Sequence, residues 1–175
     1  MHTKILVAYA TRMESTSEVA EVIGMILHEQ DVNADVLSID EIEEVASYDA
    51  VIIGSAIRGE AWLPEAVKFI EQHRHALSKV PVAYFTVCMT MREDTPENRR
   101  KAEAYHKPVL TAVPEVQPID VGLFGGMLET TEFPRLMRWV ISTLNLPSGD
   151  YRNWDTIRRW TEAVYPRLLE SSIKS

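Results

Sequence analysis

Short apolar runs that alternate with helix-patterned stretches are the feature that most constrains how this chain folds. Residues 5–8 and 51–53 are apolar without interruption, as in strands that are buried on both faces of a sheet. Residues 17–30 follow the first run and change to a helical period. The apolar stripe of this stretch consists of Val19, Val22, Ile23, Ile26 and Leu27. This order of elements predicts a parallel sheet with helices on both faces.

The same alternation continues to the end of the chain. Further strands are expected at 34–39, 80–87 and 117–124, which gives five parallel strands in all. Helices are expected from Pro64, from the sequence Asp94-Thr95-Pro96-Glu97, over 133–146 and from about Trp154. Pro108 should kink or split the helix that begins near Asp94. No repeat or linker divides the sequence, so residues 1–175 are expected to form a single domain.

The acidic residues gather in the first part of the chain. The formal net charge is −8, and residues 1–50 hold 11 acidic side chains against 2 basic ones, a local net charge of −9. An acidic surface repels phosphates, which argues against binding to nucleic acid. This region either steers a basic redox partner or is a solvated face, and the solvated face is the favoured interpretation.

The number of cysteines and the hydropathy of the chain indicate the cellular compartment in which the protein is expected. The single cysteine, Cys88, excludes an internal disulfide, which agrees with a reducing cytosol. The N-terminus lacks the features of a signal peptide, and no apolar run approaches the roughly 18 residues of a membrane span. A cytoplasmic protein without stable membrane insertion is therefore expected. The five histidines do not have metal-ligand spacing, so no metal site is expected.

The loops that follow the buried strands are the expected location of a ligand. Loops 9–16, 54–63 and 87–95 all lie at the carboxyl edge of the predicted sheet, where ligands bind in such folds, and 124–133 is expected to form a wall. The first loop carries the hydroxyls of Thr11, Ser15 and Thr16 directly before a helix.

Two properties of this first loop favour an anion. Free backbone N–H groups and the helix dipole attract negative charge at a helix N-terminus. An ordinary N-cap needs only one hydroxyl, whereas this loop has three, Thr11, Ser15 and Thr16. The loop is therefore interpreted as a phosphate cradle. Ser15 and Glu18 also have the spacing of a capping box.

Several other phosphate-handling sites are excluded by what the loop lacks. It contains neither a G-x-G-x-x-G fingerprint nor the Gly-Lys-Ser/Thr of a P-loop. A phosphatase would need its nucleophile here, but Cys88 follows the fourth strand. A receiver domain would need acidic residues where Tyr9 and Gly54-Ser55 stand. A hydroxyl-rich loop without these features is typical of folds that bind flavin mononucleotide (FMN).

The sequence resembles the flavodoxin family at this point. The pattern Tyr9-Ala10-Thr11-Arg12, Ser15-Thr16 and an amphipathic helix is similar to the family's first flavin loop. Residues 51–58 with Trp62, and the stretches 120–126, 135–146 and 149–157, are similar to the branch that includes menaquinone-dependent protoporphyrinogen dehydrogenases. The resemblance covers nearly the whole chain. It implies a flavodoxin-like three-layer α/β sandwich with a five-stranded parallel sheet in the order 2-1-3-4-5.

The resemblance also implies non-covalently bound FMN, which the protein orients while electrons pass through the exposed ring edge. No catalytic acid or nucleophile is expected. Loop 11–16 would hold the phosphate, and loops 55–62 and 86–91 would flank the ring. The cofactor-binding residues so implied are Thr11, Arg12, Met13, Glu14, Ser15, Thr16, Ala56, Ile57, Arg58, Trp62, Thr86, Val87, Cys88 and Met89. Trp62 either stacks on the flavin or packs at a helix start. Cys88 either lies near the flavin or is a small buried residue, and the second is the commoner role of a lone cysteine at a strand end.

Two residues depart from the family pattern. Glu14 and Glu60 stand where the family tends to have glycine. Glycine permits positive φ and a close approach of the backbone to a ligand, and a carboxylate near a phosphate costs energy unless it points into solvent. In the favoured interpretation both side chains point outward and the loops adjust. In the alternative, FMN binding is weakened or lost.

These sequence features are compatible with three alternative functions. The first is an FMN-binding redox protein that exchanges electrons with a partner protein. The second is an oxidoreductase like the quinone-dependent protoporphyrinogen dehydrogenases. The third is a flavodoxin-fold interaction module with weakened or lost FMN binding. Residues 135–144 are amphipathic with a basic edge, so this helix could rest on a membrane or shape a quinone entry. Packing beside the sheet is the favoured interpretation.

Overall fold

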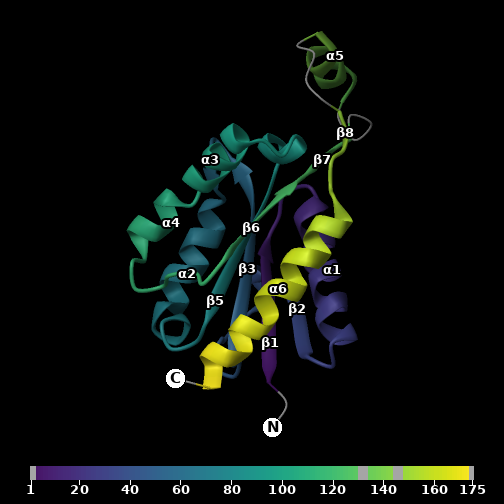
Figure 1. Ribbon diagram of the computed structural model, residues 1–175. Coiled ribbons are helices and arrows are strands. Elements are labelled where there is room, and N and C mark those ends of the chain that lie inside the picture. The colour runs from purple at the N-terminus through teal and green to yellow at the C-terminus, as the bar shows by residue number, and fades with distance from the viewer. Residues whose placement is uncertain (1–2, 130–133, 144–147, 174–175) are drawn as a thin grey trace.

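A parallel sheet forms the middle layer of the computed structural model, which describes residues 3–129, 134–143 and 148–173 (Figure 1). The parallel strands lie in the order β2-β1-β3-β5-β6. Their bounds are Lys4–Ala10 (β1), Asn33–Ser38 (β2), Ala50–Arg58 (β3), Val82–Cys88 (β5) and Val121–Gly125 (β6). This confirms the expected flavodoxin-like class and strand order. A short antiparallel strand, β4 (Ala61–Trp62), makes the sheet six-stranded rather than five-stranded, because the chain folds back on the end of β3.

Helices cover both faces of this sheet (Figure 1). α1 and α6 pack on one face, α2 and α4 pack on the other, and α3 packs against β6 and the turn that follows β5. The bounds are Ser15–Glu29 (α1), Pro64–Leu77 (α2), Pro96–Ala104 (α3), Lys107–Ala112 (α4) and Trp154–Ile173 (α6), with 3-10 turns at Ile39–Glu41 (η1) and Met89–Arg92 (η2).

Burial on both faces explains the continuous apolar runs. Leu6 and Val51 point into the core under α2, whereas Ile5 and Ile52 point into the core under α1 and α6. All four side chains are fully buried. Successive side chains of a strand point to opposite faces, so a strand between two helix layers has no position for a polar residue. Polar groups are therefore confined to the ends of the strands.

The start of α1 differs from the expected one. The helix begins at Ser15 rather than Ser17, and no side chain caps it. Ser15 is buried inside the first turn, and the Glu18 carboxylate pairs with Arg152 instead of returning to the backbone. The expected capping box is therefore wrong. Its physical reason is the backbone of Glu14, whose φ of 48° lies in the left-handed region and turns the chain into the helix early.

Prolines act largely as expected in the third helical region. α3 begins at Pro96, and the Thr95 hydroxyl caps it by accepting a bond from the Asn98 N–H at 3.2 Å. The region is split into α3 and α4, with Pro108 in the first turn of α4. A proline is tolerated there because that N–H has no partner within the helix. The last parallel strand begins at Val121, four residues later than expected, and Pro118 lies outside it.

The segment after β6 leaves the body of the molecule. β7 (Met127–Leu128) and β8 (Gly149–Asp150) pair antiparallel, and they carry α5 (Arg135–Thr143) beyond the carboxyl edge of the sheet (Figure 1). We call β7, α5 and β8 the arm. A helix is present within the expected range 133–146, whose positions 133 and 144–146 lie outside the described residues. The expectation that it packs beside the sheet is wrong, since α6 already covers the nearby face and Leu136 is 75% exposed.

Candidate functional site

A cavity opens at the carboxyl edge of the sheet, below the arm. Its volume is about 480 Å³, within the range of small-molecule sites. Four segments line it: the loop after β1, the β3–β4 region, the end of β5 and the start of the arm. The lining residues are Arg12, Met13, Ser15, Ala56, Ile57, Arg58, Leu63, Val87, Cys88, Met89, Gly126, Met127 and Leu128. The structure thus brings together residues from all three loops singled out in the sequence, and 126–128 forms a further wall.

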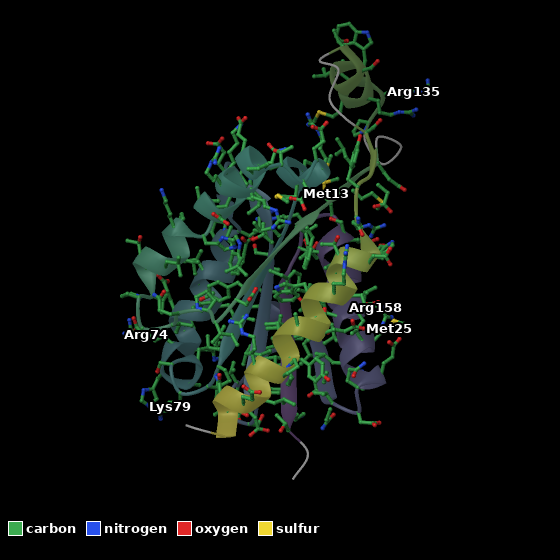
Figure 2. The ribbon with its side chains drawn as sticks, in the orientation of Figure 1. Met13, Met25, Arg74, Lys79, Arg135 and Arg158 are labelled. Atoms are coloured by element: carbon green, nitrogen blue, oxygen red, sulfur yellow. The ribbon has the colours of Figure 1, made fainter. Side chains whose placement is uncertain are left out.

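Some of these lining residues were not expected from the sequence, and some of the expected site residues do not line the cavity. Leu63 and residues 126–128 were not named individually, although they belong to the loops 54–63 and 124–133 that the sequence analysis singled out. Met13 stands at the edge beneath the arm (Figure 2), where its side chain is 40% exposed. Thr11, Glu14, Thr16, Trp62 and Thr86 do not line the cavity.

Two of these threonines carry buried hydroxyls without partners. Thr11 Oγ1 and Thr16 Oγ1 are both inaccessible, and neither bonds to any residue that the structure describes. A buried polar atom without a partner costs roughly 1–3 kcal/mol. Thr16 lies in the first turn of α1, next to the cavity residue Ser15, where backbone N–H groups are also free. This local chemistry fits an oxyanion that accepts from hydroxyl and amide donors.

The two glutamates in these loops retain a glycine-like backbone. Glu14 has φ 48° and Glu60 has φ 60°, both in the left-handed region. Their side chains are exposed, in agreement with the expectation that they point outward. The loops, however, do not adjust their backbones. Residues other than glycine rarely adopt this backbone conformation, which destabilises the fold by about 1 kcal/mol or more.

Arg12 and Arg58 bring positive charge to the cavity lining. Arg12 forms an ion pair with Glu65 at the start of α2, which ties the first loop to that helix. The pKa of Glu65 lies below its usual value, first because of a backbone hydrogen bond and then because of Arg12 and Arg58. The Arg12 charge is thus partly neutralised by Glu65.

Thr86, and Trp62 in one of its two interpretations, were expected to flank the flavin, but both are in the core behind the cavity wall. Trp62 is 2% exposed and packs against Tyr84, with ring centroids 4.9 Å apart. Its Nε1–H donates to Thr86 Oγ1 at 2.8 Å. The correction has a simple reason: an indole N–H beneath two helices needs a buried acceptor, and Thr86 supplies it.

His106 completes this buried chain of hydrogen bonds. Thr86 Oγ1 accepts from Trp62, so its own proton is free to go to His106 Nε2, 2.8 Å away. His106 Nδ1–H then donates to the Glu103 carbonyl at 3.2 Å. Burial lowers the pKa of His106, which agrees with this neutral tautomer. The chain fixes β4, and with it the 55–62 loop, against β5. Nothing in the local sequence around His106 signals this contact.

Cys88 contributes an uncharged wall to the cavity. Its side chain is 6% exposed, and burial raises the pKa of the thiol. A thiol of raised pKa stays protonated and is a poor nucleophile. Cys88 therefore lies at the cavity and is also a small buried residue.

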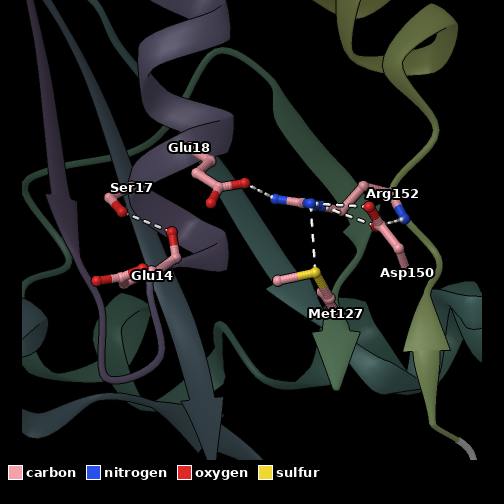
Figure 3. A network of polar contacts seen from close by, with 6 residues as sticks. All are labelled: Glu14, Ser17, Glu18, Met127, Asp150 and Arg152. Atoms are coloured by element: carbon pink, nitrogen blue, oxygen red, sulfur yellow. Dashed lines mark hydrogen bonds and ion pairs between the residues drawn. The ribbon is translucent and has the colours of Figure 1, made fainter. Parts of the chain in front are cut away.

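Arg152 joins α1 to the arm (Figure 3). Its side chain is only 7% exposed and pairs with Glu18 on α1 and Asp150 on β8. Its Nη2 also lies 3.4 Å from the Met127 sulfur, and its guanidinium lies 4.7 Å from the Trp154 ring centroid. Since Met127 lines the cavity, Arg152 fixes that wall relative to α1. No local pattern signals this network, because the spacing of Ser15 and Glu18 suggested a capping role for Glu18.

Comparisons with known proteins agree with this geometry. Residues 6–155 match the family model described as "Flavodoxin domain". The chain is 24% identical over 172 residues to "Protoporphyrinogen IX dehydrogenase [quinone]" of Escherichia coli strain K12, covering 92% of this chain and 94% of the relative. It is 25% identical over 190 residues to the protein of the same name from Leishmania major, covering 98% and 81%.

Solved structures show the same fold. Flavodoxin 2 from Bacillus cereus aligns with a TM-score of 0.59 and 18% identity, covering 94% of this chain and 99% of that chain. A flavodoxin from the domain Archaea aligns with a TM-score of 0.57 and 16% identity, covering 95% and 99%. Within the described residues, no helix is long and apolar enough to cross a membrane, and no group of three or more His, Cys, Asp or Glu side chains is placed to hold a metal.

Replacing Glu14 with glycine tests the strained loop. Glu14→Gly should raise the free energy of unfolding by about 0.5–1 kcal/mol, because glycine adopts positive φ without strain. FMN affinity should also rise severalfold, because a carboxylate leaves the loop that is expected to hold the phosphate. Asp31→Gly is the matched control, since Asp31 has φ 57° at the far end of α1. It should gain stability without a change in FMN affinity. Urea unfolding and FMN titration measure both effects, and equal FMN affinities in the two variants would contradict the electrostatic argument.

Replacing Arg152 with methionine tests the link between α1 and the arm. Arg152→Met should destabilise the protein by about 1–2 kcal/mol, because it leaves two carboxylates without their shared partner. It should also weaken FMN binding, since Met127 loses its support. Arg158→Met is the control: Arg158 pairs with Glu29 farther along α1, with both side chains more than two-fifths exposed, and such surface pairs contribute about 0–1 kcal/mol. Equal losses of stability and FMN affinity in the two variants would show that Arg152 has no special role.

Proposed function

The chain belongs to the flavodoxin domain family and is an FMN-binding redox protein; on this premise we propose that the cavity holds the flavin and that electrons pass from an organic donor to a quinone. The single observation that carries the cofactor site is a pair of buried hydroxyls without partners, that of Thr16 in the first turn of α1 and that of Thr11 in the loop before it. Burial of these hydroxyls without hydrogen bonds destabilises the protein, and an oxyanion that accepts hydrogen bonds from them offsets this loss.

The first loop is the proposed phosphate subsite. Thr11, Ser15 and Thr16 supply hydroxyl donors, and the first turn of α1 supplies N–H groups and the positive end of its dipole. Glu14 lies between them in sequence, but its exposed side chain leaves the carboxylate in solvent, where water screens its repulsion of a phosphate. Glu14 therefore weakens this subsite without abolishing it.

The remaining cavity walls are the proposed ring subsite. Ala56 and Ile57 come from the β3 side, whereas Val87, Cys88 and Met89 come from the end of β5. Such apolar walls exclude water from one part of a flat aromatic ligand and fix its orientation. When bound, FMN supplies the acceptor for two electrons or one. Arg58 brings a positive charge to the same lining, which favours an anionic donor molecule near the opening.

The identity of the donor and the acceptor rests on the relatives. Two of them are named protoporphyrinogen IX dehydrogenase [quinone], and the alignment with the Escherichia coli protein covers 92% of this chain. This supports a quinone as the acceptor and a porphyrinogen as the donor. An acidic surface over residues 1–50 supports a second candidate, electron transfer to a basic partner protein.

An absorption spectrum of the purified protein tests the cofactor, and anaerobic reduction tests the reaction. The protein should be yellow and should release FMN on denaturation. Protoporphyrinogen should bleach the flavin band, and an added quinone should restore it. A protein that is colourless and does not take up FMN would instead support an interaction module that has lost its cofactor. Bleaching by dithionite but not by protoporphyrinogen would favour the electron-transfer candidate.

Thr16→Val separates a phosphate ligand from a structural threonine. Valine has the same shape and removes a buried hydroxyl that lacks a partner, so the apoprotein should be as stable as the original or more stable by about 1 kcal/mol. FMN affinity should fall about tenfold or more, because a hydrogen bond to a charged group is lost.

Thr161→Val is the matched control. Thr161 is also fully buried, but its hydroxyl donates to the Ile157 carbonyl within α6 at 2.9 Å. This variant should lose stability and keep its FMN affinity. If Thr16→Val destabilises the apoprotein and leaves FMN affinity unchanged, the hydroxyl is structural and the phosphate subsite is wrongly placed.

A further inference from the structure

The helix of the arm exposes an apolar face that the body of the protein does not cover. Every α5 side chain that the structure describes is exposed. Leu136 is 75% exposed, Trp139 65%, Met137 48% and Val140 36%. Large apolar side chains gathered on one element and left in water mark an interaction site rather than ordinary surface.

The remaining side chains of α5 give this face a polar border. At 100° per residue, Leu136, Met137 and Val140 share one arc of the helix, and Arg135 and Arg138 lie on the other side. Trp139 lies between the two arcs, where its ring can stay apolar while its N–H faces water. The helix contains no acidic residue. This is the pattern of a helix that lies in the plane of a membrane surface.

The charge of the whole chain contrasts with that of α5. The protein has a formal net charge of −8, whereas α5 carries Arg135 and Arg138 and no acid. Neither arginine forms an ion pair with any residue in the described part of the chain. An anionic lipid surface attracts these two charges and repels the acidic body, so contact would be confined to the arm.

The position of the arm suits a flat partner. α5 stands apart from the three layers, at the end of the molecule opposite to both termini (Figure 1). Arg135 is on this arm, whereas Arg74 and Lys79 are at the opposite end (Figure 2). A second copy is a poorer occupant, because one nine-residue helix offers a small area compared with the roughly 1,200 Å² or more that stable protein interfaces bury.

We propose that α5 lies in the surface of an anionic lipid bilayer and holds the opening of the cavity close to it. Met127 and Leu128 connect the two, since they form β7 at the base of the arm and also line the cavity. A quinone with a long apolar tail dissolves in the bilayer rather than in water. The link to a quinone rests on the proposed function, whereas binding to lipid does not depend on it.

Co-sedimentation with quinone-free vesicles tests the lipid surface directly. FMN-loaded protein should bind vesicles of an equal mixture of phosphatidylcholine and phosphatidylglycerol, bind less in high salt, and bind weakly to phosphatidylcholine alone. Leu136→Asp should reduce the bound fraction about tenfold or more. Met25→Asp is the matched control, because Met25 is 62% exposed on α1 and receives the same charge change; its binding should match the original protein.

Charge reversal provides a second pair of variants. Arg135→Glu should reduce binding to the anionic vesicles severalfold, whereas Lys79→Glu, at the opposite end of the molecule, should leave it unchanged. Flavin content and circular dichroism check that each variant is folded. Trp139→Ser adds a change without charge, which should also reduce binding.

Three results would overturn the proposal. The first is a lack of binding to the anionic vesicles by the original protein. The second is equal binding by Leu136→Asp and Met25→Asp. The third is a dimer in sedimentation that Leu136→Asp dissociates without any vesicle binding, which would make a second copy the occupant. Vesicle binding with no bleaching by protoporphyrinogen would uphold the lipid surface and contradict the proposed donor, so the two claims fail separately.

Discussion

Burial of the central sheet on both faces is the constraint on which the rest of the structure depends. β1, β3 and β5 lie between two helix layers, and side chains such as Ile5 and Ile52 have no access to water. A sheet of this kind can carry polar chemistry only where its strands end. The loops after these three strands therefore meet at one edge, and the cavity forms there. The arm extends from the same edge because β6 ends there as well (Figure 1).

The site contains two destabilising features that a bound ligand can offset. Thr11 and Thr16 hold hydroxyls that are buried without partners, and Glu14 holds a backbone conformation that suits glycine. Neither feature stabilises the protein by itself. Both are consistent with a loop whose shape is set by an oxyanion. The backbone of Glu14 adopts a conformation that glycine adopts more easily. The loop can accommodate a glutamate at this position because the side chain extends into solvent.

Local patterns predicted the fold well and predicted the site in part. The strands and the helix starts at Pro64 and Pro96 followed from apolar period and proline position, whereas the strand order followed from the family resemblance. Trp62 was misplaced because its partner, Thr86, is 24 residues away in the chain. Arg152 was missed because it meets Glu18 across 134 positions. Contacts of this length leave no trace in a local pattern. The exposed arm was misjudged for a related reason, since an amphipathic helix has the same sequence pattern whether it covers a sheet or a membrane.

A titration of the apoprotein with FMN and with riboflavin tests the central claim most directly. The two ligands share the ring and the ribityl chain and differ in the phosphate, so the comparison isolates the role of the loop at residues 11–16. The account predicts that FMN binds at least about a hundredfold more tightly than riboflavin, because the phosphate satisfies several buried donors at once. Equal affinity for the two ligands would contradict the assignment of this loop as the phosphate cradle.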